Sequence, residues 1–182
     1  MRAASLLGAT ECPNTNSRSA STPPEYFKAI GLTFDLDPCS PGPGHWVPAL
    51  KIYTAADDGL RQPWPPNDRV FMNPPFGGRR GHVPWLRKFF AHPGGGIALV
   101  AARTSADWFH EVVVPNAELL CFPNGKTKFH RPDGSIGREP GTGVVLAWVA
   151  SHVRRCCAAN SAPATCPRGS ADHAHPRHPS RY

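Results

Sequence analysis

One stretch decides how this sequence is interpreted: Arg69-Val70-Phe71-Met72-Asn73-Pro74-Pro75-Phe76-Gly77-Gly78. Its first four residues form a short β-prone run, which predicts a strand over 69–72. The two prolines that follow lock φ and donate no hydrogen bonds, so the strand ends there and their carbonyls are left as acceptors. Asn73 adds a side-chain acceptor before the prolines, and two glycines after Phe76 let another molecule approach the backbone closely.

A planar ligand with an amino group fits this stretch. The amino group would donate to the side-chain oxygen of Asn73 and to the carbonyl of Pro74, while the ring of Phe76 would stack on the ligand's face. Two such acceptors would turn the lone pair of an exocyclic nitrogen, for example N6 of adenine, towards a methyl donor. A base in DNA would have to leave the duplex to reach this pocket. Taken alone, the tetrapeptide is explained equally well as a strand-ending turn, because the chain holds 22 Pro.

Outside this stretch, short β-prone runs alternate with helical patterns. This alternation predicts an α/β fold with a mostly parallel central sheet, helices on both faces and a ligand beyond the carboxyl ends of the strands. Residues 123–143 are rich in Gly and Pro and predict a C-terminal antiparallel hairpin with Pro132-Asp133-Gly134 as its turn. The predicted strands are 33–37, 51–54, 69–72, 97–102, 118–122 and 144–149, and the predicted helices are 24–30, 83–91 and 106–113.

The large aromatic residues define the extent of the folded part. All 9 Phe and all 5 Trp lie between Phe27 and Trp148. The flanks lack the apolar groups that would offset the entropy lost on ordering the chain. We therefore predict a flexible segment at 1–20, one domain at 21–150, and a disordered basic tail at 151–182.

The charge is compatible with a nucleic-acid partner but does not establish one. The formal net charge is +7, yet residues 22–150 hold 13 Lys and Arg against 11 Asp and Glu. Most of the excess therefore lies outside the predicted domain, and the domain itself is close to neutral.

Several function classes find no support in the sequence. The 6 Cys form no C-x-x-C pair and no zinc-finger spacing, so we expect no metal site and a reduced, cytoplasmic setting. No apolar run approaches the roughly 20 residues that cross a bilayer, so we expect no membrane span. The apolar patch near Met1 is too short for a secretory signal peptide.

Several further blocks stand in order along the chain. They are Thr22-Pro23-Pro24-Glu25-Tyr26-Phe27, Phe34-Asp35-Leu36-Asp37-Pro38-Cys39, Asp58-Gly59-Leu60 with Trp64, Asn73-Pro74-Pro75-Phe76, Ala101-Ala102-Arg103-Thr104 with Trp108-Phe109, and Gly125–Phe129. In this order they resemble the phage-type DNA N-6-adenine methyltransferases, a Rossmann-like family that depends on S-adenosyl-L-methionine (AdoMet). The chain departs from the wider AdoMet-dependent pattern at 37–44, which lacks the usual F-x-G-x-G, and it lacks the aromatic residue that often precedes the Thr-Pro block.

The resemblance implies a role for each matching position. Asn73, Pro74, Pro75 and Phe76 match the catalytic [D/N/S]-P-P-[Y/F/W] signature. Thr22 and Pro23 would pack against the methionine moiety of AdoMet, and Asp58 would lie beside its adenine. Asp37, Pro38 and Cys39 would form the AdoMet loop, although an Asp at a strand end also serves simply to cap the residues that follow it.

The resemblance also implies double-stranded DNA as the partner. Arg79, Arg80, Lys126 and Lys128 are candidates to hold its phosphates, and ordinary surface charge explains any single one of them equally well. Arg103 is also a DNA-binding candidate, and its place after a strong predicted strand makes it a better candidate for a role that faces the site. The predicted activity is methyl transfer from AdoMet to adenine N6 in a bacterial or phage-infected cell, with a restriction-modification system as one setting. The alternatives are a methyltransferase of RNA or of a protein glutamine and an inactive DNA-binding relic. The oligomeric state stays open.

Overall fold

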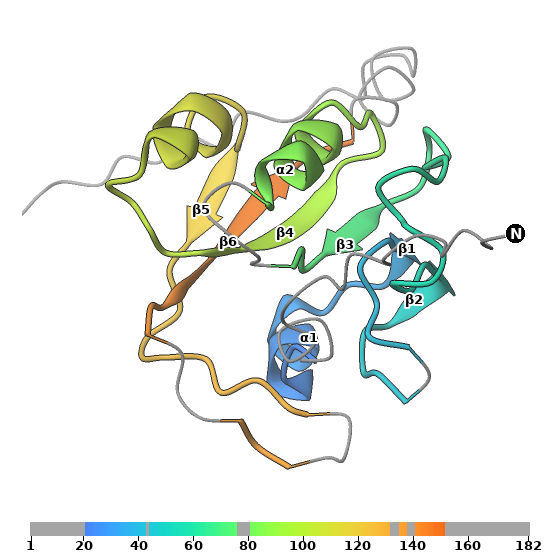
Figure 1. Cartoon of the computed structure of the whole chain (residues 1–182), viewed down its shortest axis with the longest axis horizontal. Coiled ribbons are helices and arrows are strands. Elements are labelled where there is room, and N and C mark those ends of the chain that lie inside the picture. The colour runs from blue at the N-terminus through green and yellow to red at the C-terminus, as the bar shows by residue number, and fades with distance from the viewer. Residues whose placement is uncertain (1–20, 43, 76–80, 132–134, 138–140, 152–182) are drawn as a thin grey trace, which may run out of the picture.

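The computed structural model describes residues 21–42, 44–75, 81–131, 135–137 and 141–151. Six strands within them form one sheet (Figure 1). The flexible segment predicted at 1–20 and nearly all of the tail predicted at 151–182 lie outside the described residues. The strands are β1 (Phe34–Asp37), β2 (Ala49–Ile52), β3 (Val70–Met72), β4 (Gly96–Ala101), β5 (Leu119–Cys121) and β6 (Val144–Val149); the helices are α1 (Pro24–Ile30), α2 (Val83–Phe90) and a π-helix, η2 (Phe109–Val113).

The sheet is mixed, and its strands stand in the order β2-β1-β3-β4-β6-β5. β1 pairs in parallel with β2 and β3, and β3 with β4, whereas β6 runs antiparallel to both of its neighbours. The predicted α/β sheet is thus parallel in its first four strands and antiparallel at its C-terminal edge. The strand order reverses between β1 and β3, because the chain adds β2 on one side and β4 on the other.

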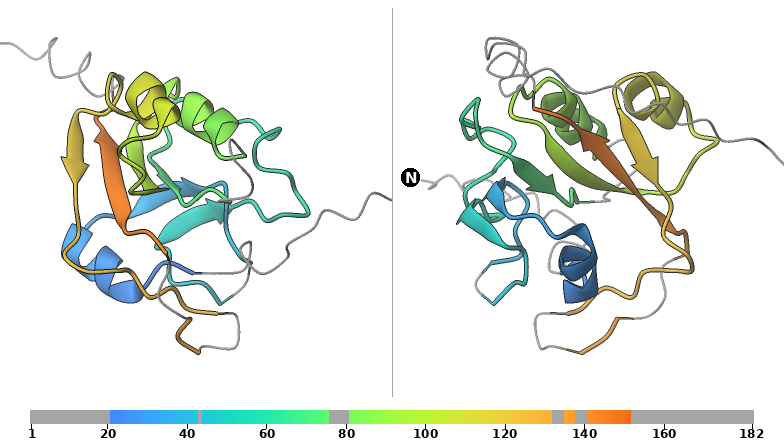
Figure 2. Two further views of the ribbon diagram at one scale, coloured as in Figure 1. Left: turned by 60° about the vertical axis from the view of Figure 1, so that its left-hand side comes forward. Right: turned by 180° about the vertical axis from the view of Figure 1, so that it is seen from behind.

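Helices cover both faces of the sheet, as predicted. α1 lies on one face, and α2 and η2 lie on the other (Figures 1 and 2). Successive side chains of the inner strands alternate between the two layers. On β3, the Phe71 ring packs against Phe27 of α1 with 4.9 Å between ring centroids, whereas Met72 belongs to the cluster that includes residues of α2 and η2. Both β3 residues are almost fully buried, so the strand that leads into Asn73 is fixed from both sides.

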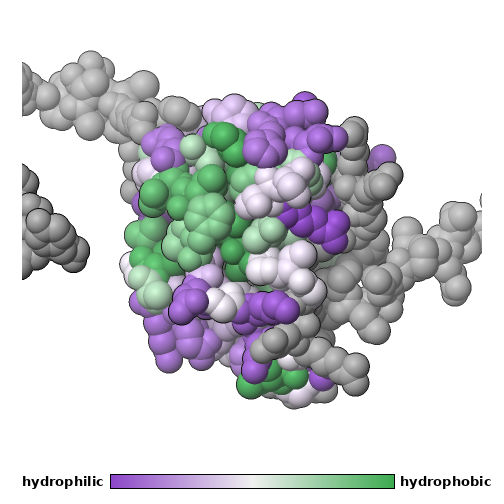
Figure 3. Space-filling view, turned by 90° about the vertical axis from the view of Figure 1, so that its left-hand side faces the viewer, coloured by the Kyte–Doolittle hydropathy of each residue, from purple (hydrophilic) through white to green (hydrophobic). Residues whose placement is uncertain are grey.

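The two outer strands are much less buried than the inner ones. On β5, Leu119 is 60% exposed, and Phe122 just beyond the strand is 59% exposed. Figure 3 shows the apolar surface that gathers on this side of the molecule. At the opposite edge, Leu50 of β2 is 88% exposed. Burial is therefore concentrated on the four inner strands, β1, β3, β4 and β6.

The strand predicted at 51–54 was placed too late. β2 begins at Ala49, which stands opposite Phe34 of β1. As an edge strand with mostly accessible side chains, β2 carries no clear alternation of apolar and polar residues. Its position is set by pairing with β1, which the local sequence does not reveal.

The helix predicted at 106–113 exists, but its regular part is a π-helix. The Val114 amide donates to the Phe109 carbonyl over 2.9 Å, which closes the wider turn. A π turn holds more than the roughly 3.6 residues of an α turn, so side chains four positions apart lie more nearly above one another. Phe109 and Val113, four apart and both buried, therefore face the same core.

The hairpin predicted over 123–143 is shorter than expected. Antiparallel pairing joins 129–131 to 135–137, with His130 opposite Ile136. The predicted turn at 132–134 lies outside the described residues. His130 also pairs with Ser21, because the segment before α1 lies along this part of the chain.

Candidate active site at the carboxyl edge of the sheet

The carboxyl ends of β1 and β3 lie side by side where the strand order reverses. Leu36 of β1 stands opposite Val70 of β3, so Asp37 at the end of β1 and Asn73 after β3 come to the same edge. In open parallel sheets, ligands bind in the crevice outside these ends. The structure thus brings together two residues that the sequence assigned to different roles, Asp37 to the methyl donor and Asn73 to catalysis.

The side chain of Asn73 is held by Thr22, which comes from a distant part of the sequence. Nδ2 of Asn73 donates to Oγ1 of Thr22 over 3.2 Å. Thr22 is only 2% exposed, so little water competes for this contact. Because Nδ2 already donates to Thr22, Oδ1 of Asn73 is the side-chain atom that can accept a hydrogen bond from a ligand.

The two prolines after Asn73 lie beyond the end of β3. Pro74 is buried and Pro75 is partly buried. The other predicted residues of this stretch, Phe76, Arg79 and Arg80, lie outside the described residues.

Asp37 is a buried carboxyl at this edge, with only 2% of the residue exposed. Its Oδ1 accepts a hydrogen bond from the backbone amide of Cys39 over 3.0 Å, which is the capping contact that the sequence left open. Burial raises the pKa of Asp37 from 3.8 to about 7, because this one hydrogen bond only partly replaces the lost solvent. A ligand that donates hydrogen bonds or carries positive charge would stabilise the ionised form.

Cys39 beside it is a packing residue rather than a nucleophile. Burial and the neighbouring charge of Asp37 raise the pKa of the Cys39 thiol well above its ordinary value, so the thiolate is disfavoured. Among the described residues, no group of three His, Cys, Asp or Glu side chains could hold a metal ion.

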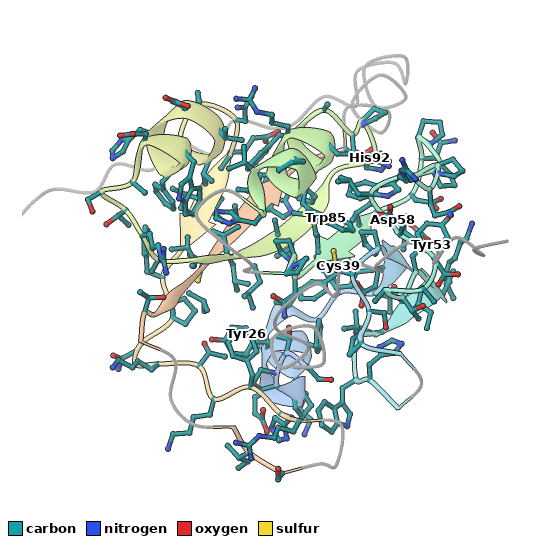
Figure 4. All side chains as sticks on the ribbon, viewed as in Figure 1. Tyr26, Cys39, Tyr53, Asp58, Trp85 and His92 are labelled. Atoms are coloured by element: carbon teal, nitrogen blue, oxygen red, sulfur yellow. The ribbon has the colours of Figure 1, made fainter. Side chains whose placement is uncertain are left out.

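Asp58 lies on a turn-rich loop, residues 55–62, that packs against the segment after β1; we call it the Asp58 loop. Gly59 makes the closest approach, since a Cβ atom there would stand 2.1 Å from the Pro38 carbonyl oxygen. Asp58 itself has a φ of 51°, which is uncommon for a residue other than glycine. Figure 4 shows Cys39, Tyr53 and Asp58 on the same side of the molecule. The structure therefore gathers the positions assigned to AdoMet after β1 and on this loop.

The Asp58 loop is fixed by two side chains outside it. The indole Nε1 of Trp64 donates to the Gly59 carbonyl over 2.9 Å. From α2, Nζ of Lys88 donates to the carbonyls of Leu60 and Gln62 over 2.7 and 2.6 Å, and it lies 4.7 Å from the centre of the Trp64 ring. Sequence reasoning missed Lys88, because a lysine in a helix carries no sign of such a contact.

The described basic candidates lie on two separate elements. Arg103 is exposed and follows β4, so it stands at the same carboxyl edge as Asn73. Lys126 and Lys128 are exposed on the loop after β5, on either side of the buried Thr127. The hydroxyl of Thr127 hydrogen-bonds to that of Tyr26, which ties this loop to α1.

His82 is a second residue that the sequence did not single out. It directly precedes α2, is 5% exposed, and packs edge-on against Trp108 with 4.3 Å between ring centroids. Burial lowers the pKa of His82, and the positive charge of Arg103 lowers it further. A neutral imidazole therefore lies between the start of α2 and the end of β4, beside the candidate site.

The fold and the site define an α/β protein whose polar loops gather where the strand order reverses. Comparison with known families identifies the family to which this protein belongs. The chain belongs to the family described as DNA N-6-adenine-methyltransferase (Dam), whose model matches residues 10–154. The resemblance noted in the sequence is thereby confirmed, and membership makes the chain a DNA adenine methyltransferase by family. No curated protein and no solved structure matches it.

Proposed function

We propose that this protein transfers a methyl group from AdoMet to N6 of adenine in double-stranded DNA, with Asn73, Pro74, Pro75 and Phe76 as the catalytic stretch. The observation that carries the proposal is the position of Asn73. It directly follows a fully buried central strand, next to the point where the strand order reverses, and its amide is already held on one side by Thr22. The family supports the same chemistry.

The strand order supports a Rossmann-like arrangement. The first four strands are parallel, and the order reverses once, between β1 and β3. A ligand that lies across this reversal contacts loops from both halves of the sheet. Asp37 and Asp58 would bind the methyl donor from one half of the sheet, and Asn73 would bind the target base from the other half.

The residues at the edge fit AdoMet, which supplies an electrophilic methyl group when bound. Asp37 is a desolvated carboxyl whose charged form gains from a cationic ligand or from hydroxyl and amino donors. Pro23, Pro38, Cys39 and Asp58 complete the predicted donor-binding set. The close fit of Gly59 against Pro38 holds the Asp58 loop against the segment after β1.

The proposed reaction requires the protein to position the two reactants and to accept two hydrogen bonds. Oδ1 of Asn73 and the Pro74 carbonyl would accept the two N6 protons and turn the nitrogen lone pair to one face, and Phe76 would stack on the flipped base. One N–C bond forms as one S–C bond breaks, and a proton then leaves the methylated nitrogen to solvent. Positioning and electrostatics supply the rate, without a covalent intermediate on the protein. Such an enzyme would act in the cytoplasm of a bacterial or phage-infected cell.

The test is transfer of radiolabelled methyl from AdoMet with the full chain. DNA, RNA and a protein acceptor are offered separately. We expect label in adenine of DNA, and we expect Asn73→Ala to abolish it while AdoMet affinity, measured by calorimetry, stays within a few-fold. Label only in RNA or protein, or near-normal turnover by Asn73→Ala, would contradict the proposal.

A further inference from the structure

We propose that Thr22 is a positioning residue that aims the Asn73 side chain at the target amine, in place of the contact with the methyl donor that the family resemblance implied. This inference rests on the proposed function, because it takes Asn73 as the acceptor of an N6 proton. In this role Thr22 affects the reaction only by holding Asn73, and it does not contact the reacting atoms.

The argument starts from the asymmetry of an amide. Asn73 has an acceptor on one side of its terminal group and two donors on the other. To accept from a substrate amino group, Oδ1 must face the substrate, which turns Nδ2 in the opposite direction, into the protein. There Nδ2 meets Oγ1 of Thr22 at 3.2 Å. Thr22 therefore satisfies the donor that the reactive orientation of Asn73 turns inward.

Burial makes this contact consequential. Thr22 is 2% exposed, and Asn73 is partly buried. Without the hydroxyl oxygen, Nδ2 would lose the acceptor that it has in the reactive orientation, and a donor removed from water without an acceptor is costly. The amide would then rotate or flip. A flipped amide presents its own NH2 to the substrate NH2, so that two donors face each other and no bond forms.

Thr22 is itself held in place on both sides. Before it, Ser21 and His130 exchange two backbone hydrogen bonds, of 2.8 and 3.0 Å. After it, Pro23 leads into α1, where its carbonyl accepts from the Tyr26 amide over 3.1 Å. A side chain can fix the orientation of another only if its own position is fixed, because its movement would otherwise move its partner as well.

The test uses variants of Thr22 that differ in one feature at a time. Thr22→Val keeps the shape and removes the oxygen, whereas Thr22→Ser keeps the oxygen. We expect Thr22→Val to lower kcat roughly 10- to 100-fold, the scale of one lost buried hydrogen bond. Its Kd for AdoMet should stay within about 3-fold, and Thr22→Ser should keep kcat within about 3-fold of the natural protein.

Each alternative result has a definite meaning. A fall in AdoMet affinity for Thr22→Val with unchanged kcat at saturation would overturn the inference and make Thr22 a donor contact. Unchanged kcat and affinity would also overturn it. If Thr22→Val does not fold, Thr22→Ala compared with Thr22→Ser isolates the same oxygen atom. Failure of the proposed function shows up separately, as normal turnover by Asn73→Ala.

Discussion

At the scale of single residues, the candidate site joins a half-buried amide to a buried carboxyl, and these groups respond differently to solvent. Asn73 is neutral, so burial costs it only hydrogen bonds, and Thr22 supplies one. The buried carboxyl of Asp37 must either hold a proton or have its negative charge compensated. In the described part of the chain, the backbone amide of Cys39 is the one hydrogen-bond partner of this carboxyl. Burying a carboxyl with so little compensation lowers the free energy of unfolding. Buried groups whose pKa is shifted in this way are typical of functional sites.

The raised pKa of Asp37 predicts a pH dependence of stability. The folded protein keeps a proton at about pH 4 to 7 that the unfolded chain, with a pKa of 3.8, has released. The unfolding free energy should therefore fall as pH rises through this window, by about 2–3 kcal/mol between pH 5 and pH 8. Asp37→Asn should lose this dependence and be the more stable protein at pH 8.

Urea unfolding at the two pH values measures the effect. Asp107→Asn, at an exposed carboxyl after β4, is the matched control and should keep the natural slope. An Asp37→Asn profile parallel to that of the natural protein would contradict the assignment.

At the scale of elements, α2 connects both halves of the site. It follows the Asn73 stretch in sequence, and its Lys88 binds two carbonyls of the Asp58 loop. Lys88→Met keeps most of the apolar stem but leaves those carbonyls without their donor, at about 1–3 kcal/mol. We expect a lower Tm and an AdoMet Kd raised roughly 5- to 30-fold, with kcat at saturation little changed.

Differential scanning calorimetry and AdoMet titration check this expectation. Arg87→Met, at the exposed neighbouring position of α2, is the control and should leave both quantities near their natural values. Should both variants bind AdoMet equally well, Lys88 would not hold the loop in its binding conformation.

The elements also show what the sequence could predict. α1 was predicted with its observed bounds, because two prolines start it and Gly31, with a φ of 64°, ends it. The edge strand β2 and the π-helix were less well predicted, because pairing and core packing determine them. Asn73 and Asp37 were found through their places after strands and through the family resemblance. The contact of Asn73 with Thr22 and that of Tyr26 with Thr127 join residues 51 and 101 positions apart and leave no local trace.

At the scale of the whole molecule, the domain is nearly neutral, so DNA must be held by a few well-placed charges. Lys126 and Lys128 are exposed on a loop that α1 holds through Tyr26 and Thr127. The double variant Lys126→Ala/Lys128→Ala should weaken DNA binding about equally for all sequences. The slope of log affinity against log salt should fall by about 2 units.

Fluorescence anisotropy at several salt concentrations gives this slope. Lys51→Ala provides the comparison, because Lys51 is exposed on β2, at the opposite edge of the sheet from β5. Equal slopes for the natural protein and the double variant would remove these lysines from the DNA-binding surface.

The position of β6 has a consequence for the order in which the protein can be completed during synthesis. Of the six described strands, β6 is the last to leave the ribosome, yet it stands between β4 and β5 and is the only one of the six that joins them. Until residues 144–149 emerge, the apolar strand β5 has no partner and β4 has an open edge. Between the emergence of β5 and that of β6, the nascent chain therefore carries two unpaired, aggregation-prone edges. A newly made copy can therefore close this sheet only after residues 144–149 have emerged, later than the stretch that holds Asn73.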